Sequence, residues 1–305
     1  MQQELPHGEI AVEPIEETNE EIQKLADTEE CALLAFVAPY SGVRVTPVAE
    51  AYASIGVHEE FGVESFVERC KEAKLGKLHL LVNSPGGGVV SSYKVARALR
   101  VQFREIRVFV PHMAASGGTL IALTGNEIVM GLMSHLTPLD LQVPYGGALI
   151  SSNTFLRCFQ RFMEAYRKLQ PEEAPYPLRW MTEKLDPRIM EEMNGATQTC
   201  LKYIERILRA AGHDEADASK KALTLVTGYS DHAAVLDRDV LAEHGFRVVP
   251  DSKYAHEWKV MRLWLKQYIG RSESVHHMRY CLPKKKGPGP PRARKGRGAS
   301  LKKSR

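Results

Sequence analysis

The 305-residue sequence lacks the marks of several protein classes. Its cysteines number only five, at positions 31, 70, 158, 200 and 281. Their odd number, and the absence of any C-x-x-C pair, indicate free thiols in a reducing compartment and neither a zinc site nor a disulfide framework. No apolar run approaches the roughly 20 residues that span a bilayer, and the first thirty residues lack the apolar core of a signal peptide. We therefore expect a cytoplasmic protein.

Charge is distributed unevenly along the chain. Residues 1–30 contain ten acidic side chains and one lysine, whereas residues 284–305 contain ten basic side chains and no acid. The first 283 residues together carry 31 basic and 37 acidic side chains, a net charge of −6. The sequence pI of about 8.7 therefore comes from the tail and does not indicate a basic nucleic-acid-binding domain.

Composition and patterning divide the chain into four parts. We expect an acidic, mobile arm over residues 1–30, where apolar periodicity is weak, and a folded domain over residues 31–250. Residues 251–282 are expected to form a helical extension. Residues 283–305 consist of Pro, Gly and basic residues, which cannot build a core and predict a disordered tail.

Within residues 31–250, short apolar runs alternate with amphipathic segments. Buried strands are predicted at 31–38, 78–82, 106–110 and 127–130, with helices at 65–74, 90–103, 152–169, 190–211 and 216–226. A loop or excursion is expected over residues 171–187. Such alternation predicts βαβ units, that is, an α/β fold with a parallel sheet flanked by helices.

Two glycine-rich turns each follow a predicted strand. The first is Asn83-Ser-Pro-Gly-Gly-Gly88, and the second is Ala114-Ala-Ser-Gly-Gly118. Parallel sheets place their functional sites at the carboxyl ends of their strands, where both turns fall. The first turn is not a Walker loop, because no Gly-Lys-Ser/Thr follows it, and Ala114 breaks the G-x-S-x-G pattern of common hydrolases.

Ser116 is the candidate nucleophile. Small neighbours let its hydroxyl project, and the predicted helix that follows supplies backbone N–H groups with a partial positive potential. Successive glycines in the first turn can aim further N–H groups into the same space. We therefore expect Gly86, Gly87, Gly88 and Gly117 to form an oxyanion hole, whose donors are each worth roughly 3–4 kcal/mol.

Together the two turns resemble those of the Clp protease–crotonase superfamily, and in particular its signal peptide peptidase A and serine dehydrogenase proteinase group. The segments Ser134-His-Leu-Thr-Pro-Leu-Asp-Leu-Gln142 and Leu225-Val-Thr-Gly-Tyr-Ser-Asp-His232 resemble conserved segments of serine dehydrogenase proteinases. The resemblance covers residues 31–250 and implies a crotonase-like (Clp protease-like) fold of repeated ββα units. It also implies a serine endopeptidase acting on peptides or unfolded proteins, without metal or cofactor, in a closed homo-oligomer.

The base that activates Ser116 is left open by the sequence. Clp-type enzymes carry a histidine where this chain has Asp140, 24 residues after the serine, and an acid near the position of His232. The resemblance therefore suggests exchanged roles, with His232 as the base and Asp140 as its orienter. His135, 19 residues after the serine, is another candidate.

A lysine base is the alternative, as in peptidases of the signal peptide peptidase A type. Lys168 lies 52 residues after Ser116, but it is more simply explained as a solvated cation at a helix end. A lysine base must be buried to lose its proton near neutral pH.

Two other functions fit the same turns. A crotonase-type acyl-CoA enzyme would use the oxyanion turns with a carboxylate or another base in place of Ser116. A non-catalytic scaffold would keep the fold and recruit a partner through its tail, since residues 284–305 suit non-specific contact with nucleic acid or an anionic surface. A solvated tail that aids solubility explains the same residues equally well.

Overall fold

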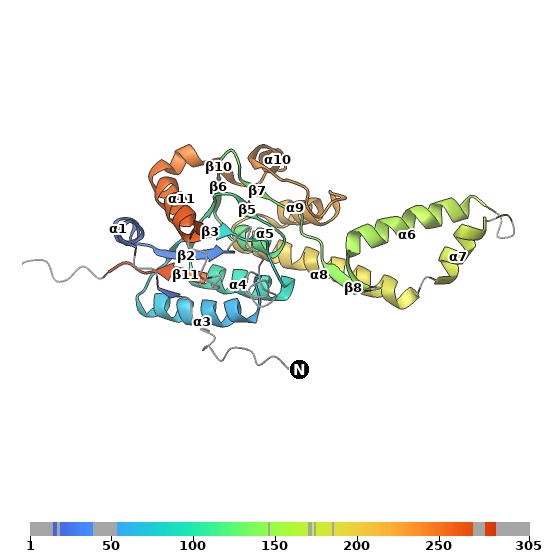
Figure 1. The fold of residues 1–305 in the computed structure, drawn as a ribbon, viewed down its shortest axis with the longest axis horizontal. Helices are drawn as coiled ribbons and strands as arrows, with labels where there is room; N and C mark the ends of the chain where they lie inside the picture. Colours follow the sequence, from blue (N-terminus) through green and yellow to red (C-terminus); the bar gives the residue numbers. More distant parts are fainter. Residues whose placement is uncertain are drawn as a thin grey trace, which may run out of the picture.

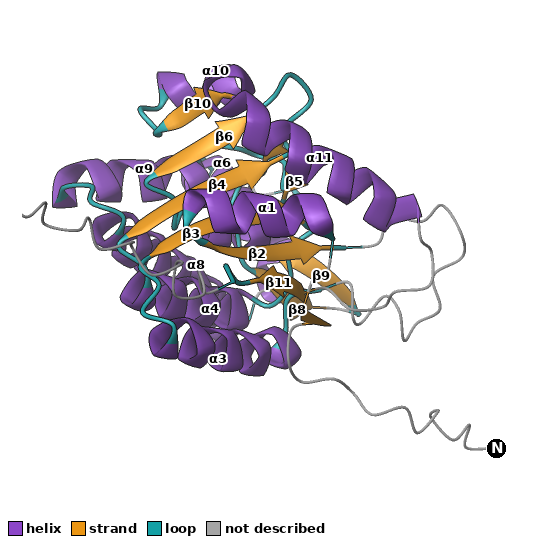
Figure 2. Ribbon diagram, turned by 90° about the vertical axis from the view of Figure 1, so that its left-hand side faces the viewer, coloured by secondary structure: helices purple, strands orange, loops and turns teal. Residues whose placement is uncertain are grey.

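The computed structural model describes residues 15–16, 19–38, 54–145, 147–169, 173, 175–184, 186–270 and 278–284. At its centre lies a mostly parallel sheet with helices on both faces (Figure 2), and a helical arm projects from one side (Figure 1). The predicted α/β class is therefore confirmed.

Within the described residues, seven strands form the main sheet in the order β1-β11-β2-β3-β4-β6-β10. All neighbours run parallel except β11 and β2. The central strands are buried on both faces, which is why their sequences are almost uninterrupted apolar runs. The strand bounds are β1 Ile15–Glu16, β2 Ala32–Val37, β3 Lys77–Asn83, β4 Glu105–Val110, β6 Glu127–Met130, β10 Val248–Pro250 and β11 Met278–Cys281.

Alternate residues of each strand enter two separate cores. Leu34 and Leu80 point into the larger core, where they pack against helices α3, α4, α5, α8 and α9. Leu33 and Leu81 point into the smaller core, against α1 and α11. The helix bounds are α1 Glu20–Glu29, α3 Val57–Glu72, α4 Val89–Gln102, α5 Gly117–Ala122, α8 Pro187–Ala210, α9 Glu215–Thr227 and α11 Ala255–Gly270.

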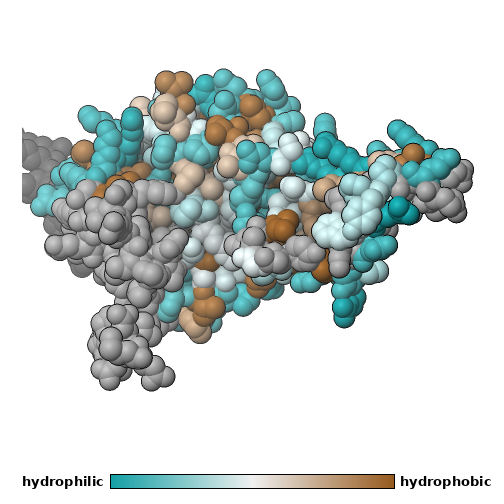
Figure 3. All heavy atoms as spheres, turned by 45° about the vertical axis from the view of Figure 1, so that its right-hand side comes forward, coloured by the Kyte–Doolittle hydropathy of each residue, from teal (hydrophilic) through white to brown (hydrophobic). Residues whose placement is uncertain are grey.

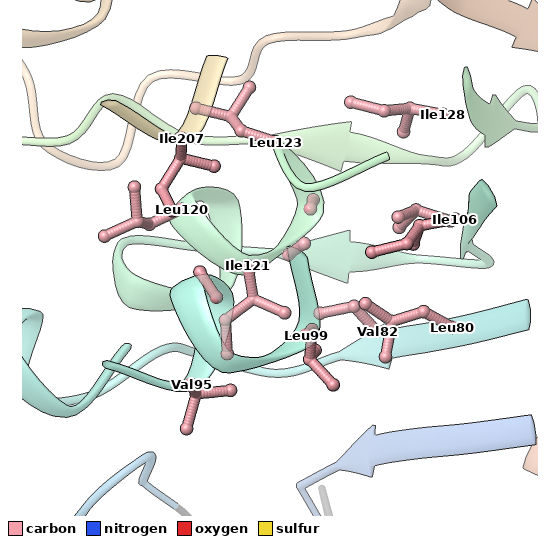
Figure 4. Packing of buried hydrophobic residues seen from close by; sticks show 14 of the residues in the cluster. Leu80, Val82, Val95, Leu99, Ile106, Leu120, Ile121, Leu123, Ile128 and Ile207 are labelled. Carbon is pink, nitrogen blue, oxygen red and sulfur yellow. The ribbon is translucent and has the colours of Figure 1, made fainter. Parts of the chain in front are cut away.

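Short strands after β4 and β6 give the sheet a small second layer. β5 (Met113–Ala114) pairs in parallel with β7 (His135–Leu136). The run β4-β5-α5 is one ββα unit of the predicted kind, and Ser116 lies within it, between β5 and α5. The helix that follows Ser116 is entirely buried: Leu120 and Ile121 pack among Val95, Leu99 and Ile207 (Figure 4). The second glycine-rich turn is therefore anchored in the larger core.

A helical arm projects from the sheet. It begins with the hairpin of β8 (Gln142–Tyr145) and β9 (Ala148–Ser151), continues through α6 (Ser152–Arg167) and α7 (Tyr176–Lys184), and returns along α8 (Figure 1). In the described part of α6 only Ser152 and Asn153, at its base, are buried. Figure 3 shows mostly hydrophilic and weakly hydrophobic surface over the arm.

Three sequence-based boundaries need correction. The predicted mobile arm of residues 1–30 includes the packed helix α1, because Ile22, Leu25 and Ala26 are buried between its acidic residues. The predicted extension 251–282 is not only helical, since it ends in β11, which pairs with β2. The excursion expected at 171–187 contains helix α7.

The predicted tail 283–305 lies outside the described residues except for residues 283 and 284. Across the part of the chain that is described, no helix combines the length and apolar character needed to cross a membrane.

Candidate active site

The two glycine-rich turns lie against each other. Ser84 and Ala114 form a parallel bridge. Ser84 N donates to Met113 O at 2.9 Å, and Ala115 N donates back to Ser84 O at 2.9 Å. The backbone of the first turn is therefore paired directly with the segment that leads into Ser116.

The closest approach is made by Gly86, whose φ is +100°. A Cβ atom on this residue would lie 2.4 Å from Ala115 O and 2.9 Å from Ser116 Cβ. No side chain fits there without displacing Ser116, so glycine is required by both the backbone conformation and the contact.

Ser116 has an unusual backbone conformation, with φ +48° and ψ −120°. Serine avoids this region because its Cβ crowds the backbone, and such residues cost of order 1–3 kcal/mol. The residue is half-buried and immediately precedes α5. Nucleophilic serines at strand-to-helix elbows are strained in a similar way, with the hydroxyl exposed at the turn.

The hydrogen bonds of the turns show which N–H groups remain available. Gly86 N donates to Ser84 Oγ at 3.1 Å, and Gly88 N donates to Ile55 O at 2.9 Å. Gly87 N and Gly117 N donate to no acceptor among the described residues. Gly87 and Gly117 are also neighbours, since a Cβ on Gly117 would lie 3.2 Å from Gly87 N.

These hydrogen bonds correct the expectation that all four glycines contribute to the oxyanion hole. The N–H groups of Gly86 and Gly88 are already used within the protein, so they cannot also hold an oxyanion. Two candidate donors remain, Gly87 from the first turn and Gly117 from the second.

Asp140 and His232, which are 92 residues apart in the sequence, form a side-chain pair in the structure. His232 Nδ1 hydrogen-bonds Asp140 Oδ1. The Asp140 side chain is 6% exposed and that of His232 29% exposed, so the imidazole lies at the edge of the buried carboxylate. With Nδ1 occupied by Asp140, His232 retains Nε2 as a possible proton acceptor.

The backbone holds the segments of this pair together. Leu136 and Leu236 exchange backbone hydrogen bonds of 2.9 and 3.0 Å, and Leu139 N donates to Leu225 O at 3.0 Å. The segment around His232 therefore lies along the one that leads from β7 to Asp140. Ser116 Oγ makes no hydrogen bond with either side chain of the pair, and it has no partner elsewhere among the described residues.

The two partners shift each other's proton affinity. The hydrogen bond that His232 makes to Asp140 raises the pKa of His232 above 6.5, although burial opposes this. Burial would raise the pKa of Asp140, but hydrogen bonds from His232 and Ser151 outweigh it and lower that pKa below its usual value. The pair therefore favours an ionised carboxylate beside a more basic imidazole.

His135 lies elsewhere in the second layer. Its register partner is Met113, and its ring makes an edge contact with His112, with the ring centroids 5.9 Å apart. Burial, and then the neighbouring His112, lower the pKa of His135. In the described structure no carboxylate hydrogen-bonds His135, so it lacks the orienting partner that His232 has.

Lys168 is the C-cap of α6 and is exposed. It lies at the end of α6 that points away from the sheet (Figure 1). The burial that a lysine base requires is therefore missing within this chain.

No metal-binding cluster accompanies the site. The described side chains include no group of three or more His, Cys, Asp or Glu residues that could hold a metal ion. The buried cysteines Cys31, Cys70 and Cys200 have pKa values raised to about 12 by burial, which makes them poor thiolate ligands and nucleophiles.

A family model matches the part of this chain that contains the two glycine-rich turns. Residues 70–154 match the family model described as ClpP-like SDH-type serine proteinase. The matched segment contains both glycine-rich turns, Ser116 and Asp140, so the resemblance predicted from the sequence is confirmed. This match supports a serine hydrolase.

Individual relatives cover less of the chain. The uncharacterized protein MJ0137 of Methanocaldococcus jannaschii is 44% identical over 66 residues, which are 22% of this chain and 23% of the relative. The uncharacterized protein MJ1495 of the same organism is 38% identical over 66 residues, again 22% and 23% of the two chains. The match thus spans about a quarter of the length of each relative.

Two solved structures are similar to this chain at 16% identity and a TM-score of 0.40, covering 64% of it. One is a serine-to-alanine mutant of the 1510-N membrane-bound stomatin-specific protease, of which 74% is covered. The other is a lysine-to-alanine mutant of that protease in complex with a substrate peptide, of which 70% is covered.

Sequence reasoning missed the residues that support the turns. Ile55 O accepts a hydrogen bond from Gly88 N, and Thr137 Oγ1 accepts one from Ser116 N. Ile55 lies about thirty residues before its partner and carries no motif of its own. Thr137 lies in the resembling segment 134–142, where only its neighbour Asp140 attracts attention as a titratable group.

Proposed function

We propose that this protein is a serine peptidase that cleaves peptide bonds through an acyl-enzyme on Ser116. Ser116 Oγ attacks the carbonyl carbon of the scissile bond while His232 Nε2 accepts its proton. His232 then protonates the leaving amine, and water hydrolyses the ester on Ser116 by the reverse sequence of proton transfers.

The observation that carries this proposal is the packing of the two glycine-rich turns around Ser116. A strained serine at a strand-to-helix elbow, in contact with a second glycine turn, is arranged to expose its hydroxyl beside backbone donors. A turn that served packing alone would not need a non-glycine residue at φ +48° and ψ −120°, which lies outside the left-handed helical region.

In this mechanism Gly87 N and Gly117 N hold the oxyanion of the tetrahedral intermediate. They come from the two different turns, and they donate to no other group in the described structure. Removing one such donor typically costs 100- to 1,000-fold in kcat, roughly 3–4 kcal/mol.

The Asp140–His232 pair supplies the base. Asp140 fixes the imidazole with its proton on Nδ1, which leaves Nε2 to accept the proton of Ser116. Catalytic hydrogen bonds are often long in the free enzyme and shorten when substrate binds. We therefore place the His232–Ser116 hydrogen bond in the substrate complex.

A fluorophosphonate probe tests the proposal directly. The wild-type protein should label at one serine and hydrolyse an unfolded protein such as casein, and Ser116→Ala should abolish both. Ser219→Ala, on helix α9, is the matched control and should label normally. If the folded wild type fails to label, or Ser116→Ala hydrolyses casein at the wild-type rate, the proposed function is wrong.

We also propose endopeptidase action within a homo-oligomer, which rests on the match to the ClpP-like model. Closed assemblies shield active serines from folded proteins. Light scattering should give a mass of two or more times the 34.1 kDa of one chain. Mass spectrometry of casein digests should show internal cleavage rather than loss of terminal residues, and a monomer or an exopeptidase pattern would contradict this part.

A further inference from the structure

Two buried threonines lie behind the Ser116 turn. Thr119 is in the first turn of α5, and Thr137 follows β7; they are 0% and 5% exposed. Neither can titrate, and the proposed mechanism does not use them. Their hydrogen bonds nevertheless join the turn that contains Ser116 to the segment after β7.

Thr137 binds the nucleophile's own backbone. Ser116 N donates to Thr137 Oγ1 at 2.9 Å, and the Thr137 hydroxyl lies 3.3 Å from Pro138 O, to which it can donate. Ser116 N is therefore not a third oxyanion donor. Its direction is set by a side chain from the neighbouring segment.

Thr119 holds Thr137 in place. Thr137 N donates to Thr119 Oγ1 at 3.2 Å, and the Thr119 hydroxyl lies within donating distance of Ala114 O (2.7 Å) and Thr137 O (2.9 Å). The two side chains thus link the start of the nucleophile turn, the start of α5 and the segment after β7. We call Thr119 and Thr137 the threonine clamp.

The clamp offsets the strain at Ser116. A serine at φ +48° tends to relax toward an ordinary conformation unless its surroundings hold it. Gly86 blocks movement on one side, and on the other the Thr137 hydroxyl satisfies a half-buried N–H that would otherwise lose its partner.

The clamp also connects the nucleophile to the base. Thr137 is three residues before Asp140, the carboxylate that hydrogen-bonds His232. Among the described residues, the shortest hydrogen-bonded connection from Ser116 to Asp140 runs through the Ser116 N–Thr137 hydrogen bond and the chain from Thr137 to Asp140. A change at Thr137 therefore alters where Ser116 lies relative to His232.

We propose that Thr137, held by Thr119, is a positioning residue that fixes the Ser116 turn against the Asp140–His232 pair. This proposal rests on the proposed function, because it assigns the clamp to the alignment of that nucleophile and base. It adds a residue that acts through the backbone of Ser116 and touches no substrate.

The test compares two variants of Thr137. Thr137→Val keeps the shape but removes the acceptor for Ser116 N, and Thr137→Ser keeps the hydroxyl. We expect Thr137→Val to lower kcat and the fluorophosphonate labelling rate by about 100-fold, the cost of misplacing a reacting group by roughly 1 Å, with KM unchanged. Thr137→Ser should retain most of the wild-type kcat.

Thr124→Val is the matched control. Thr124 is equally buried just after α5, and its hydroxyl donates to Ile121 O at 2.7 Å. Its replacement removes a comparable buried hydrogen bond but leaves the Ser116 turn unchanged. Thr124→Val should therefore lower thermal stability as much as Thr137→Val while keeping the labelling rate.

The labelling kinetics separate positioning from a loss of folded protein. Under the proposal, Thr137→Val labels as many sites as wild type, only more slowly, and the midpoint of its pH–rate profile stays unchanged because His232 keeps Asp140. The proposed positioning role of Thr137 would be wrong if Thr137→Val labelled fewer sites at an unchanged rate constant. It would also be wrong if Thr137→Ser labelled as slowly as Thr137→Val.

Different results would contradict the proposed role of the threonine clamp and the proposed function. If wild type labels at Ser116 and Thr137→Val labels equally fast, the clamp is wrong and the peptidase proposal stands. If wild type does not label at all, the proposed function itself is wrong.

Discussion

The two halves of the proposed catalytic set are built differently. The Ser116 half is fixed by backbone: two paired turns, a glycine in contact with the serine, and a fully buried helix behind it. The Asp140–His232 half depends on one side-chain hydrogen bond between distant segments, with His232 partly exposed.

This difference indicates how each half responds to change. Backbone geometry does not titrate, so the Ser116 half should be sensitive to added side-chain volume and insensitive to pH. The side-chain pair contains two titratable groups that shift each other's pKa, so it should be sensitive to charge and pH. Four predictions test this contrast.

Replacing the base should have the largest effect. His232→Ala leaves Ser116 without a proton acceptor, so kcat/KM should fall by a factor on the order of 10⁵ to 10⁶. Peptide hydrolysis and fluorophosphonate labelling both measure this. His135→Ala, which removes the histidine of the other resembling segment, is the control and should stay close to wild type; if it is the more damaging variant, the assigned base is wrong.

Replacing the orienting carboxylate should have the second largest effect. Asp140→Asn keeps the shape but loses the charge that stabilises the imidazolium, so kcat should fall on the order of 1,000-fold. Because Asp140 raises the pKa of His232, wild-type activity should rise with pH through a midpoint above 6.5, and Asp140→Asn should move this midpoint to lower pH. An unmoved midpoint would show that His232 is not the titrating base.

The same shift has a consequence for stability. A histidine whose pKa is raised in the folded state contributes stability that is complete below its unfolded pKa. That contribution is lost as pH rises through the raised folded pKa. Wild type should therefore lose part of its stability advantage over Asp140→Asn as pH rises through this range, which urea titrations at several pH values can measure.

Adding a methyl group at Gly86, in the turn that contacts Ser116, should slow labelling less than the two changes above but still strongly. In Gly86→Ala the new Cβ would lie 2.4 Å from Ala115 O at φ +100°, so the turns must separate. We expect labelling to slow by about 100-fold or more and Tm to fall by roughly 4–8 °C, the equivalent of about 2 kcal/mol of strain.

Gly76→Ala is the control for Gly86→Ala. It adds the same methyl group where no atom lies within 4 Å of the new Cβ, so labelling and Tm should stay near the wild-type values. Equal behaviour of the two variants would contradict the close contact between the turns.

The halves also differ in how far the sequence predicts them. The strands β3 and β4 and the turns after them are visible as apolar runs ending in glycine, because local chemistry determines both. The contact between Asp140 and His232 depends on tertiary pairing such as Leu136 with Leu236, and the sequence suggested it only through a family resemblance.

Other features had no usable sequence signal. The three buried residues of helix α1 are interspersed with acidic residues, so its apolar face is hard to recognise in the sequence. Strand β11 is only four residues long and contains the charged Arg279, so it does not stand out as an apolar run. Gly86, Gly87 and Gly88 are identical in the sequence. Only the structure shows that the N–H groups of Gly86 and Gly88 already donate, to Ser84 and Ile55. Which glycines can bind an oxyanion is therefore a property of the fold, not of the motif.

The smallest expected effect concerns the alternative base. Lys168 is exposed at the far end of α6 and lacks the burial that a lysine base requires, so Lys168→Ala should leave kcat unchanged. Arg167→Ala, the neighbouring cation, is the matched control. A large loss in Lys168→Ala alone would mean that the arm of another copy brings Lys168 to Ser116, and the base would then be supplied across an interface rather than by His232.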